Sequence, residues 1–442
     1  MVRAGAATRP AHGGLLSLLP PRILAWLARR YLFQAPRNGV GGLDLASLPD
    51  SVLWPLRRHG LDPAPELGRR CAEEPVSRLA VPFGVRAWLV TGYDEVKEVL
   101  GRVEGFSNDF GNLAGTTGVG VDHNPGGLGF ADPPVHTRLR RLLTPEFTMR
   151  RLARLAPRID TIVAQVLDAM EDEDLDAPVD LWRSFALPIP SLTICELLGV
   201  PYDERASFQQ LSAARFDLAG GAGVSLDAIG QSLSYLRDLV SRQRATPGDG
   251  LIAALIREHG DAVDDEELAG LADGILTGGL ETTASMLALG ALVLLRDPQA
   301  ATLIRGHDGE AVNRFVEELL RYLSVVQVAF PRFATRNIRV GEASIEAGDT
   351  VVCVLSAANR DRTYDGSGDV FNPTRPPRPH LAFGYGMHRC VGAELARMEL
   401  RAAYPALVRR FPGMRLAVDP TRVPFRDASI VYGVESLPVL LR

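Results

Sequence analysis

Hydrophobic positions follow a helical spacing through the middle of the chain. From about residue 134 to 295, apolar side chains recur every third or fourth residue, as at Leu139, Leu142 and Leu143. This spacing predicts a long series of helices, because residues three or four apart share one helix face. The segment Asp132-Pro133-Pro134 is a helix-start signal just before the series.

Strand-like alternation is confined to short segments. Two of them, residues 77–79 and 87–91, predict a hairpin that turns at Phe83-Gly84. A third covers residues 349–355, and a helix from just after Cys390 to about residue 410 is the last that we predict. The pattern therefore predicts a mainly α protein with small β-sheets.

The strongest helical signal runs from about Asp265 to Leu295. Asp264 followed by Glu267 resembles a capping box at its start. About 30 residues of helix span roughly 45 Å, enough to cross the whole molecule. The segment is apolar nearly all round, so we expect it to be buried.

Two regions lack a regular pattern. Residues 1–70 are punctuated by Pro and Gly, which predicts an N-terminal extension before a single domain over residues 71–442. Within it, residues 15–33 are apolar but interrupted by prolines and arginines, which favours an amphipathic helix docked on the body over contact with a membrane surface. Residues 107–132 are rich in Gly and Asn, which is typical of a functional or mobile loop.

Composition limits the classes of function. A net charge of −5, with 23% charged residues, is ordinary for a globular protein and gives no basis for nucleic-acid binding. The four cysteines, which are scattered and form no CxxC pair, are Cys71, Cys195, Cys353 and Cys390. They argue against a disulfide framework and indicate a reducing compartment, which we expect to be the cytoplasm.

The segment Phe383-Gly-Tyr-Gly-Met-His-Arg-Cys390-Val-Gly392 combines features that a thiolate ligand needs. Such a ligand is a cysteine of low pKa whose sulfur accepts backbone N–H bonds. The two internal glycines allow a tight loop against a flat cofactor, and a helix beginning at Cys390 would stabilise a negative sulfur. The alternative is a buried cysteine beside an ordinary glycine turn.

A second motif, Gly278-Gly279-Leu280-Glu281-Thr282-Thr283, lies inside the long helix. Adjacent glycines weaken a helix by about 1 kcal/mol each, so they indicate close approach or a local kink. A carboxylate in a buried helix needs a partner or a role, and Glu281 beside Thr282 could carry protons inward. The alternatives are a notch for helix packing and a threonine bonded back to the preceding turn.

Two further pairs of polar residues share a helix face. Glu318 and Arg321 are three residues apart, and such a pair is usually a surface ion pair that contributes little. His136 and Arg140 are four residues apart and could hold a carboxylate together, although basic helix faces are common.

These segments together resemble one known family. Residues 380–399 are similar to the haem-binding signature of the cytochrome P450 superfamily, in its soluble bacterial, actinobacterial-type branch. The resemblance covers about residues 75–442 and implies the cytochrome P450 fold, with the long buried helix over the haem. It implies that Cys390 ligates the iron of haem b and that Phe383 packs beside the thiolate. The residues that it places at the haem propionates are His136, Arg140, Arg332 and His388.

The resemblance also gives roles to the helix motifs. Glu281 and Thr282 match the family's acid–alcohol pair, which implies proton delivery to bound dioxygen. Glu318 and Arg321 match the ExxR pair, which implies a structural lock onto Arg375. The expected enzyme is a monooxygenase that inserts one oxygen atom from O2 into an apolar small molecule, as in antibiotic biosynthesis.

The substrate positions carried over from the family are mostly apolar, which implies a hydrophobic substrate. They are Gly274, Thr277, Gly278, Val328, Phe330, Ile430, Val431 and the loop over residues 108–130. Oxidative coupling, epoxidation or ring closure would use the same residues. A haem binder without turnover would not need an intact acid–alcohol pair, and no GxGxxG motif supports nucleotide binding at Gly384–Gly386.

Electrons must come from separate proteins, because the chain has no flavin or iron–sulfur segment. The resemblance implies that NAD(P)H supplies them through a ferredoxin reductase and a ferredoxin. Arg389 and Arg397, near the cysteine loop, are candidate docking charges. We expect a monomer that binds neither nucleic acid nor a membrane.

Overall fold

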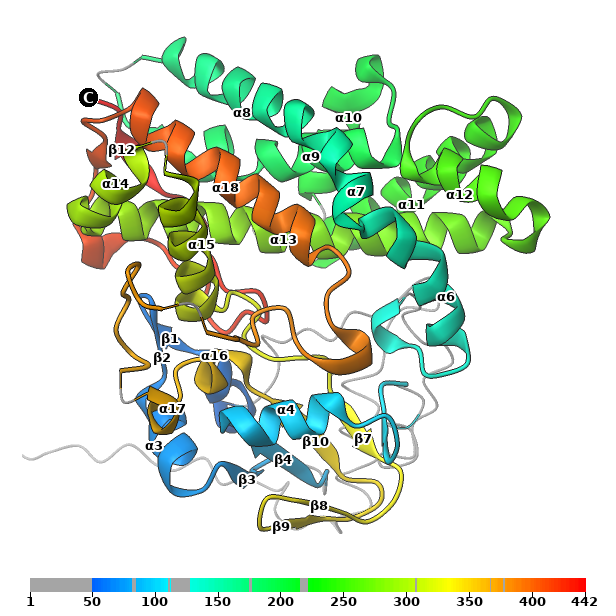
Figure 1. Cartoon of the computed structure of the whole chain (residues 1–442), viewed down its shortest axis with the longest axis vertical. Helices are drawn as coiled ribbons and strands as arrows, with labels where there is room; N and C mark the ends of the chain where they lie inside the picture. Colours follow the sequence, from blue (N-terminus) through cyan, green and yellow to red (C-terminus); the bar gives the residue numbers. More distant parts are fainter. Residues whose placement is uncertain are drawn as a thin grey trace, which may run out of the picture.

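The computed structural model describes residues 50–81, 85–109, 112, 128–174, 177–214, 222–306, 308–365, 367–376 and 378–442. Helices fill most of one side of the molecule and the five-stranded sheet lies on the other, with helix α13 (Asp265–Arg296) crossing the helical part (Figure 1). The hypotheses about residues 15–33, the Phe83-Gly84 turn and most of the 108–130 loop fall outside the described residues.

The helical layer confirms the mainly α prediction. Besides α13, its longer helices are α3 (Pro65–Glu73), α4 (Tyr93–Gly101), α6 (Val135–Leu143), α8 (Ala156–Glu171), α9 (Pro188–Leu198), α10 (Arg205–Ala214), α11 (Ala222–Ala245), α12 (Leu251–His259), α14 (Pro298–Arg305), α15 (Gly309–Leu323) and α18 (Ala393–Arg410). A short π-helix, η7 (Trp182–Ala186), precedes α9.

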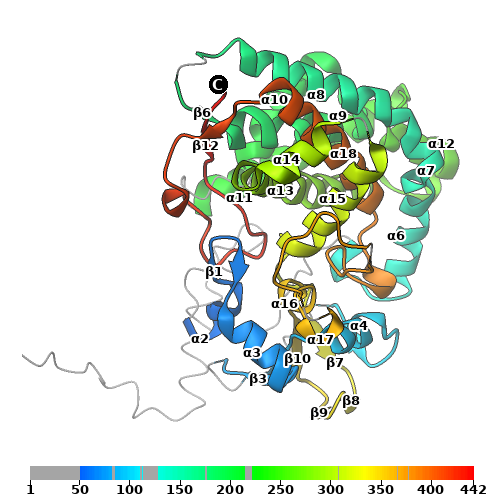
Figure 2. The same cartoon turned by 60° about the vertical axis from the view of Figure 1, so that its left-hand side comes forward.

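Helix α13 begins where the capping box predicts. The Asp264 carboxylate accepts a hydrogen bond from the Glu267 backbone N–H at 2.8 Å. Helices α9, α11, α15 and α18 surround α13, and most of its side chains are buried (Figure 2). Its length and hydropathy would suffice to cross a membrane, but 72% of its most apolar window is buried in the protein, as expected of a core helix.

The main sheet has five strands in the order β3 (Val76–Leu79), β4 (Ala87–Val90), β10 (Thr350–Cys353), β7 (Arg332–Ala334) and β5 (Phe106–Ser107). The two strands of the predicted hairpin pair antiparallel, with Val76 opposite Val90. The third predicted strand, β10, pairs parallel with β4. The smaller sheets are β11 (Arg415–Leu416), β12 (Pro438–Leu440) and β6 (Val179–Asp180); β1 (Arg58–His59) and β2 (Asp62–Pro63); and β8 (Ile338–Val340) and β9 (Ala343–Ile345).

The described part of the N-terminal extension packs into the body. Leu56, Leu61 and Leu67 are buried. The Arg58 guanidinium donates to the Gln327 side chain and to the Leu323 carbonyl, both at 2.7 Å. Residues 50–70 therefore share the core of the domain that follows.

Candidate active site

One face of α13 is open along an otherwise buried helix. Gly274, Thr277 and Gly278 are exposed, and Glu281 and Thr282 are partly exposed. These positions follow the three- and four-residue spacing of one helix face. A Cβ atom placed on Gly274 or Gly278 would meet no other atom within 4 Å. The helix therefore borders open space along this face.

Glu281 is held by an arginine from the C-terminal part of the chain. Its Oε1 accepts a hydrogen bond from Arg426 Nη1 at 2.7 Å, and both side chains are largely buried. The Arg426 guanidinium also lies over the Trp182 ring, 4.4 Å from its centroid. Burial raises the pKa of the Glu281 carboxyl, and the charge of Arg426 lowers it in part. A carboxyl of raised pKa can take up and release a proton closer to neutral pH.

The Thr282 hydroxyl donates to the Gly278 carbonyl oxygen at 2.7 Å. This is the bond to the preceding turn that the sequence left open as an alternative. Because the one hydroxyl proton is used, the Thr282 oxygen can only accept a hydrogen bond from a group in the open space. Gly279 serves packing, since a Cβ there would come within 3.2 Å of Ile194 on α9.

The cysteine loop closes around a short 3₁₀ turn, η11 (Gly386–His388). The Cys390 N–H donates to the Phe383 carbonyl at 2.9 Å, and Gly384 and Gly386 have positive φ. A Cβ on Gly386 would lie 2.3 Å from the Leu100 carbonyl oxygen, so no other residue fits there. Helix α18 starts at Ala393, three positions later than the sequence suggested.

Cys390 differs from the other three cysteines because it alone is exposed. Protein atoms around its sulfur desolvate the thiolate and so raise the thiol pKa, while the Gly392 N–H and the charges of Arg140, Arg389 and Arg397 lower it in part. Figures 1 and 2 place the segment that enters α18 below α13, between the helices and the sheets. The sulfur thus lies in a backbone cradle with cationic neighbours.

Two histidines, the buried His136 and the partly buried His388 of the loop, have ring nitrogens without a protein partner among the described residues. The His136 and His388 ring centroids are 4.2 Å apart. Both His136 nitrogens and His388 Nδ1 lack a hydrogen-bond partner among the described residues. Burial and the neighbouring Arg332 and His136 lower the pKa of His388 to about 3, and burial and Arg140 lower that of His136.

Such a cluster is costly unless an anionic group joins it. Arg332 is also buried, and one of its nitrogens donates to the Phe330 carbonyl. An acidic cofactor beside Cys390 would supply acceptors to these imidazoles and guanidinium groups. The residues present therefore fit a haem, whose two propionates are carboxylates.

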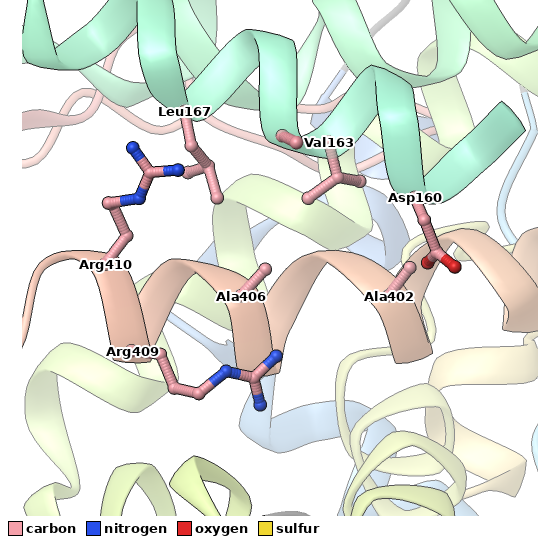
Figure 3. Close-up of a pocket in the computed structure, with 8 residues that line it drawn as sticks. Asp160, Val163, Leu167, Ala402, Ala406, Arg409 and Arg410 are labelled. Atoms are coloured by element: carbon pink, nitrogen blue, oxygen red, sulfur yellow. The ribbon is translucent and has the colours of Figure 1, made fainter. Parts of the chain in front are cut away.

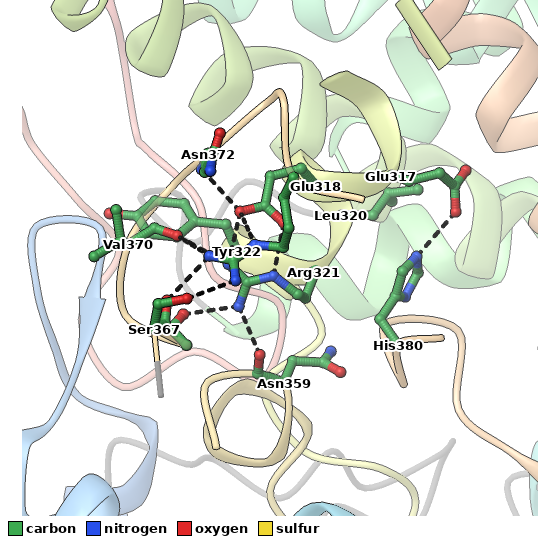
Figure 4. A network of polar contacts seen from close by, with 12 residues as sticks. Glu317, Glu318, Leu320, Arg321, Tyr322, Asn359, Ser367, Val370, Asn372 and His380 are labelled. Carbon is green, nitrogen blue, oxygen red and sulfur yellow. Dashed lines mark hydrogen bonds and ion pairs between the residues drawn. The ribbon is translucent and has the colours of Figure 1, made fainter. Parts of the chain in front are cut away.

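The Glu318–Arg321 pair lies in the interior, unlike an ordinary surface ion pair (Figure 4). Arg321 donates twice to Glu318 at 2.8 Å and to the Asn359 and Gly368 carbonyls at 2.7 Å. Arg375 Nε reaches Glu318 Oε1 at 3.3 Å. The pair therefore ties α15 to the chain that leads into the cysteine loop.

The apolar positions carried over from the family lie on neighbouring segments. The Gln327 N–H donates to the Ile430 carbonyl, and Val326 pairs with Val431. Phe330 is 48% exposed and Ile430 42%, so both present apolar surface. The Phe330 ring packs edge-on against Phe130, with centroids 4.6 Å apart. Val328, which is partly buried, lies two residues before Phe330 on the same segment.

A separate groove of about 610 Å³ lies between α8 and α18 (Figure 3). Its lining includes Val163, Leu167, Ala402, Ala406 and Arg409. None of the predicted site residues lines it, so it is not the space that α13 and Cys390 border.

Sequence reasoning missed several contacts and placed one residue wrongly. Arg426, which contacts the predicted acid, and Trp182, over which Arg426 lies, carried no motif. Arg397 is only 9% exposed and is bound to Glu317, so the expectation that it is a docking charge is wrong. Arg389, in contrast, is exposed.

Comparison with known proteins decides the family. The family model described as Cytochrome P450 matches residues 75–245 and 310–427. The chain belongs to the cytochrome P450 family. Cytochrome P450-SU2 of Streptomyces griseolus is 39% identical, over 88% of this chain and 97% of that protein. Mycinamicin IV hydroxylase/epoxidase of Micromonospora griseorubida is 36% identical, over 86% and 96%.

Solved cytochrome P450 structures confirm the fold. OxyB in the complex of the X-domain and OxyB from teicoplanin biosynthesis superposes with a TM-score of 0.77 at 40% identity, covering 87% of this chain and 99% of that one. The mainly α fold with its long central helix and the assignment as a cytochrome P450 oxidoreductase are both confirmed. The family implies a haem with thiolate-ligated iron.

Proposed function

We propose that this cytochrome P450 binds haem b through Cys390 and inserts one oxygen atom from O2 into an apolar small molecule of secondary metabolism. One observation carries the proposal: the exposed Cys390 lies in a loop beside His136 and His388, whose buried ring nitrogens include three without a hydrogen-bond partner among the described residues. The hydroxylase/epoxidase relative supports oxygen insertion, with epoxidation as the nearest alternative.

The haem, when bound, supplies the electron transfer and oxygen activation that side chains cannot. The Cys390 thiolate would be the axial ligand, with the Phe383 ring beside it. His136, Arg140, Arg332 and His388 would hold the propionates. The guanidinium groups of Arg140 and Arg332 would neutralise the carboxylates, and the two neutral imidazoles would donate N–H hydrogen bonds to them.

Glu281 moves the proton in our proposal. Its carboxyl takes up a proton and releases it along the open face of α13. Thr282 accepts a hydrogen bond in that space, because its own hydroxyl proton is already donated to the Gly278 carbonyl oxygen. The ion pair with Arg426 fixes the orientation of the carboxyl between transfers.

The substrate lies against apolar surface in this proposal. Gly274, Thr277 and Gly278 leave room along α13, while Phe330 and Ile430 offer exposed apolar side chains and the neighbouring Val431 is partly exposed. An apolar molecule gains free energy there by removing this surface from water.

Electrons come from NAD(P)H through a ferredoxin reductase and an acidic ferredoxin, which we place on the exposed cysteine-loop side in the cytoplasm. Lys97 is the only lysine of the chain, and its Nζ lies 5.3 Å from the Tyr385 ring centroid in that loop. A carbodiimide should therefore cross-link an acidic ferredoxin through Lys97 or the N-terminus. Arg389→Gln should weaken this cross-linking, and an unchanged yield would move the docking surface elsewhere.

Spectroscopy of the carbon monoxide complex tests the proposal. The reduced protein with carbon monoxide should absorb near about 450 nm if a thiolate ligates the iron. A band near about 420 nm in folded protein, or no haem uptake, would overturn it. A spectral-shift screen of apolar natural products then identifies substrates, and hydroxylated or epoxidised product separates the two reactions.

A further inference from the structure

Arg397 lies against the ring of Phe383, on the helix that follows the cysteine loop. Its guanidinium carbon is 4.7 Å from the ring centroid. A cation at this distance attracts an aromatic face, most strongly when water is excluded, and Arg397 is only 9% exposed. Arg397 therefore fixes a residue whose carbonyl accepts the Cys390 N–H at 2.9 Å.

Acidic residues on two helices hold the arginine in place. Arg397 donates to both carboxylate oxygens of Glu317, at 2.6 and 2.8 Å, and to Glu394 at 2.9 Å. Bidentate pairs of this kind fix position as well as charge. Burial alone would raise the pKa of Glu317, but the bonds from Arg397 and His380 bring it down to about 2.

His380 ties the same carboxylate to the start of the loop (Figure 4). Its Nδ1 accepts the Ala382 N–H at 3.2 Å, so Nε2 carries a proton and donates to Glu317, also at 3.2 Å. Glu317 is the neighbour of Glu318, which holds Arg321 and Arg375. Two adjacent carboxylates of α15 thus anchor the cysteine loop at two points.

We propose that Arg397 is a positioning residue that clamps Phe383 and holds a positive charge near the Cys390 sulfur, and that its balance with Glu317 sets the reduction potential of the bound iron. The inference rests on the proposed haem function. Positive charge near a redox centre favours the reduced state, which carries one more electron. Two variants that break the same ion pair should therefore shift the potential in opposite directions.

Spectroelectrochemical titration of the haem-loaded variants tests this. Arg397→Gln removes the cation and leaves Glu317 and Glu394, so the potential should fall. Glu317→Gln removes an anion and leaves Arg397, so the potential should rise. The double variant should return toward the wild-type value, and Arg397→Lys should lie between Arg397→Gln and wild type.

A purely structural clamp makes a different prediction. Both single variants would then loosen the loop alike, with equal loss of melting temperature and shifts of one sign or none. That result would overturn the inference. Arg410→Gln is the matched control, because Arg410 lies on the same helix and pairs with Glu171 away from the loop; its potential should stay unchanged.

The outcomes also separate this inference from the proposed function. A wild-type protein without the thiolate band would remove the proposed function itself. A wild-type protein with the band, but with no opposite shifts, would remove only the role of Arg397. If Arg397→Gln does not fold, Glu317→Gln and Arg397→Lys still show whether the reduction potential shifts in the expected directions.

Discussion

Two glutamate–arginine pairs lie in different parts of the candidate site, one on α13 and one beside the cysteine loop. On the α13 side, Glu281 receives one hydrogen bond from Arg426, and burial leaves its pKa raised. On the cysteine side, Glu317 receives two bonds from Arg397 and one from His380, and its pKa falls to about 2. The same residue types thus give a carboxyl that can exchange protons and one that stays an anion.

The number of donors on the carboxylate explains the difference. Desolvation disfavours the charged form of both acids, and each hydrogen bond offsets part of that cost. Glu399 on α18 extends the series, because no described cation pairs with its carboxylate. Burial raises its pKa to about 8, and the nearby Thr193 hydroxyl lowers it only in part. The bonds to Glu317 thus favour a fixed carboxylate beside the cysteine loop, whereas the single bond to Glu281 leaves a carboxyl of raised pKa on α13.

The largest effect is expected from replacing Cys390, the proposed iron ligand. Cys390→Ser should lose the band near about 450 nm completely, because serine supplies no thiolate. Cys353→Ser is the matched control, since Cys353 is buried in β10, and it should keep the band. Retention of the band in Cys390→Ser would assign the ligand to another residue and end the comparison.

Glu399→Gln should stabilise the protein as the pH rises. Below about pH 4.5 both the folded and the unfolded chain hold the Glu399 proton, and the variant and wild type should be equally stable. Toward pH 8 the unfolded wild type releases that proton while the folded protein keeps it, so the wild type loses roughly 3–5 kcal/mol relative to the variant. Chemical denaturation at pH 5, 6.5 and about 8 measures this. A difference that does not grow with pH would mean that Glu399 ionises in the folded state.

Glu281→Gln should lower coupled product formation by about 100-fold, because an amide cannot relay a proton. Electrons from NAD(P)H would then be lost to peroxide, which product and peroxide yields report together. Glu281→Asp keeps an acid and should retain part of the coupling. Wild-type coupling in Glu281→Gln would remove Glu281 from the proton path.

The smallest effect should come from Arg426→Met. Removing the cation raises the pKa of Glu281 further, since the charge of Arg426 lowers it. If protonated Glu281 is the active form, the fall of kcat at high pH should move to higher pH. Arg426→Lys keeps a charge, so the fall of its kcat at high pH should stay close to the wild-type position. If the fall does not move in Arg426→Met, Arg426 only supports the fold.

Several elements could be predicted from the sequence because their signals are local. The α13 helix starts at the capping box of Asp264 and Glu267, and its open face carries the Gly278–Thr282 motif. The tight loop before Cys390 was indicated by Gly384 and Gly386, both of which have positive φ in the structure. Each of these features depends on residues within one or two helical turns of each other.

The tertiary structure alone decided which side chains meet across the fold. Arg426 is 145 residues from Glu281, and Arg397 is 80 residues from Glu317. Arginines are common in this chain, so no pattern of spacing separates these two from the others. The pKa of a carboxyl depends on burial and on nearby donors, and both are set by packing between distant segments. The sequence by itself therefore determined the ligand loop and the acid, while the fold decided which acid can titrate and which is fixed as an anion.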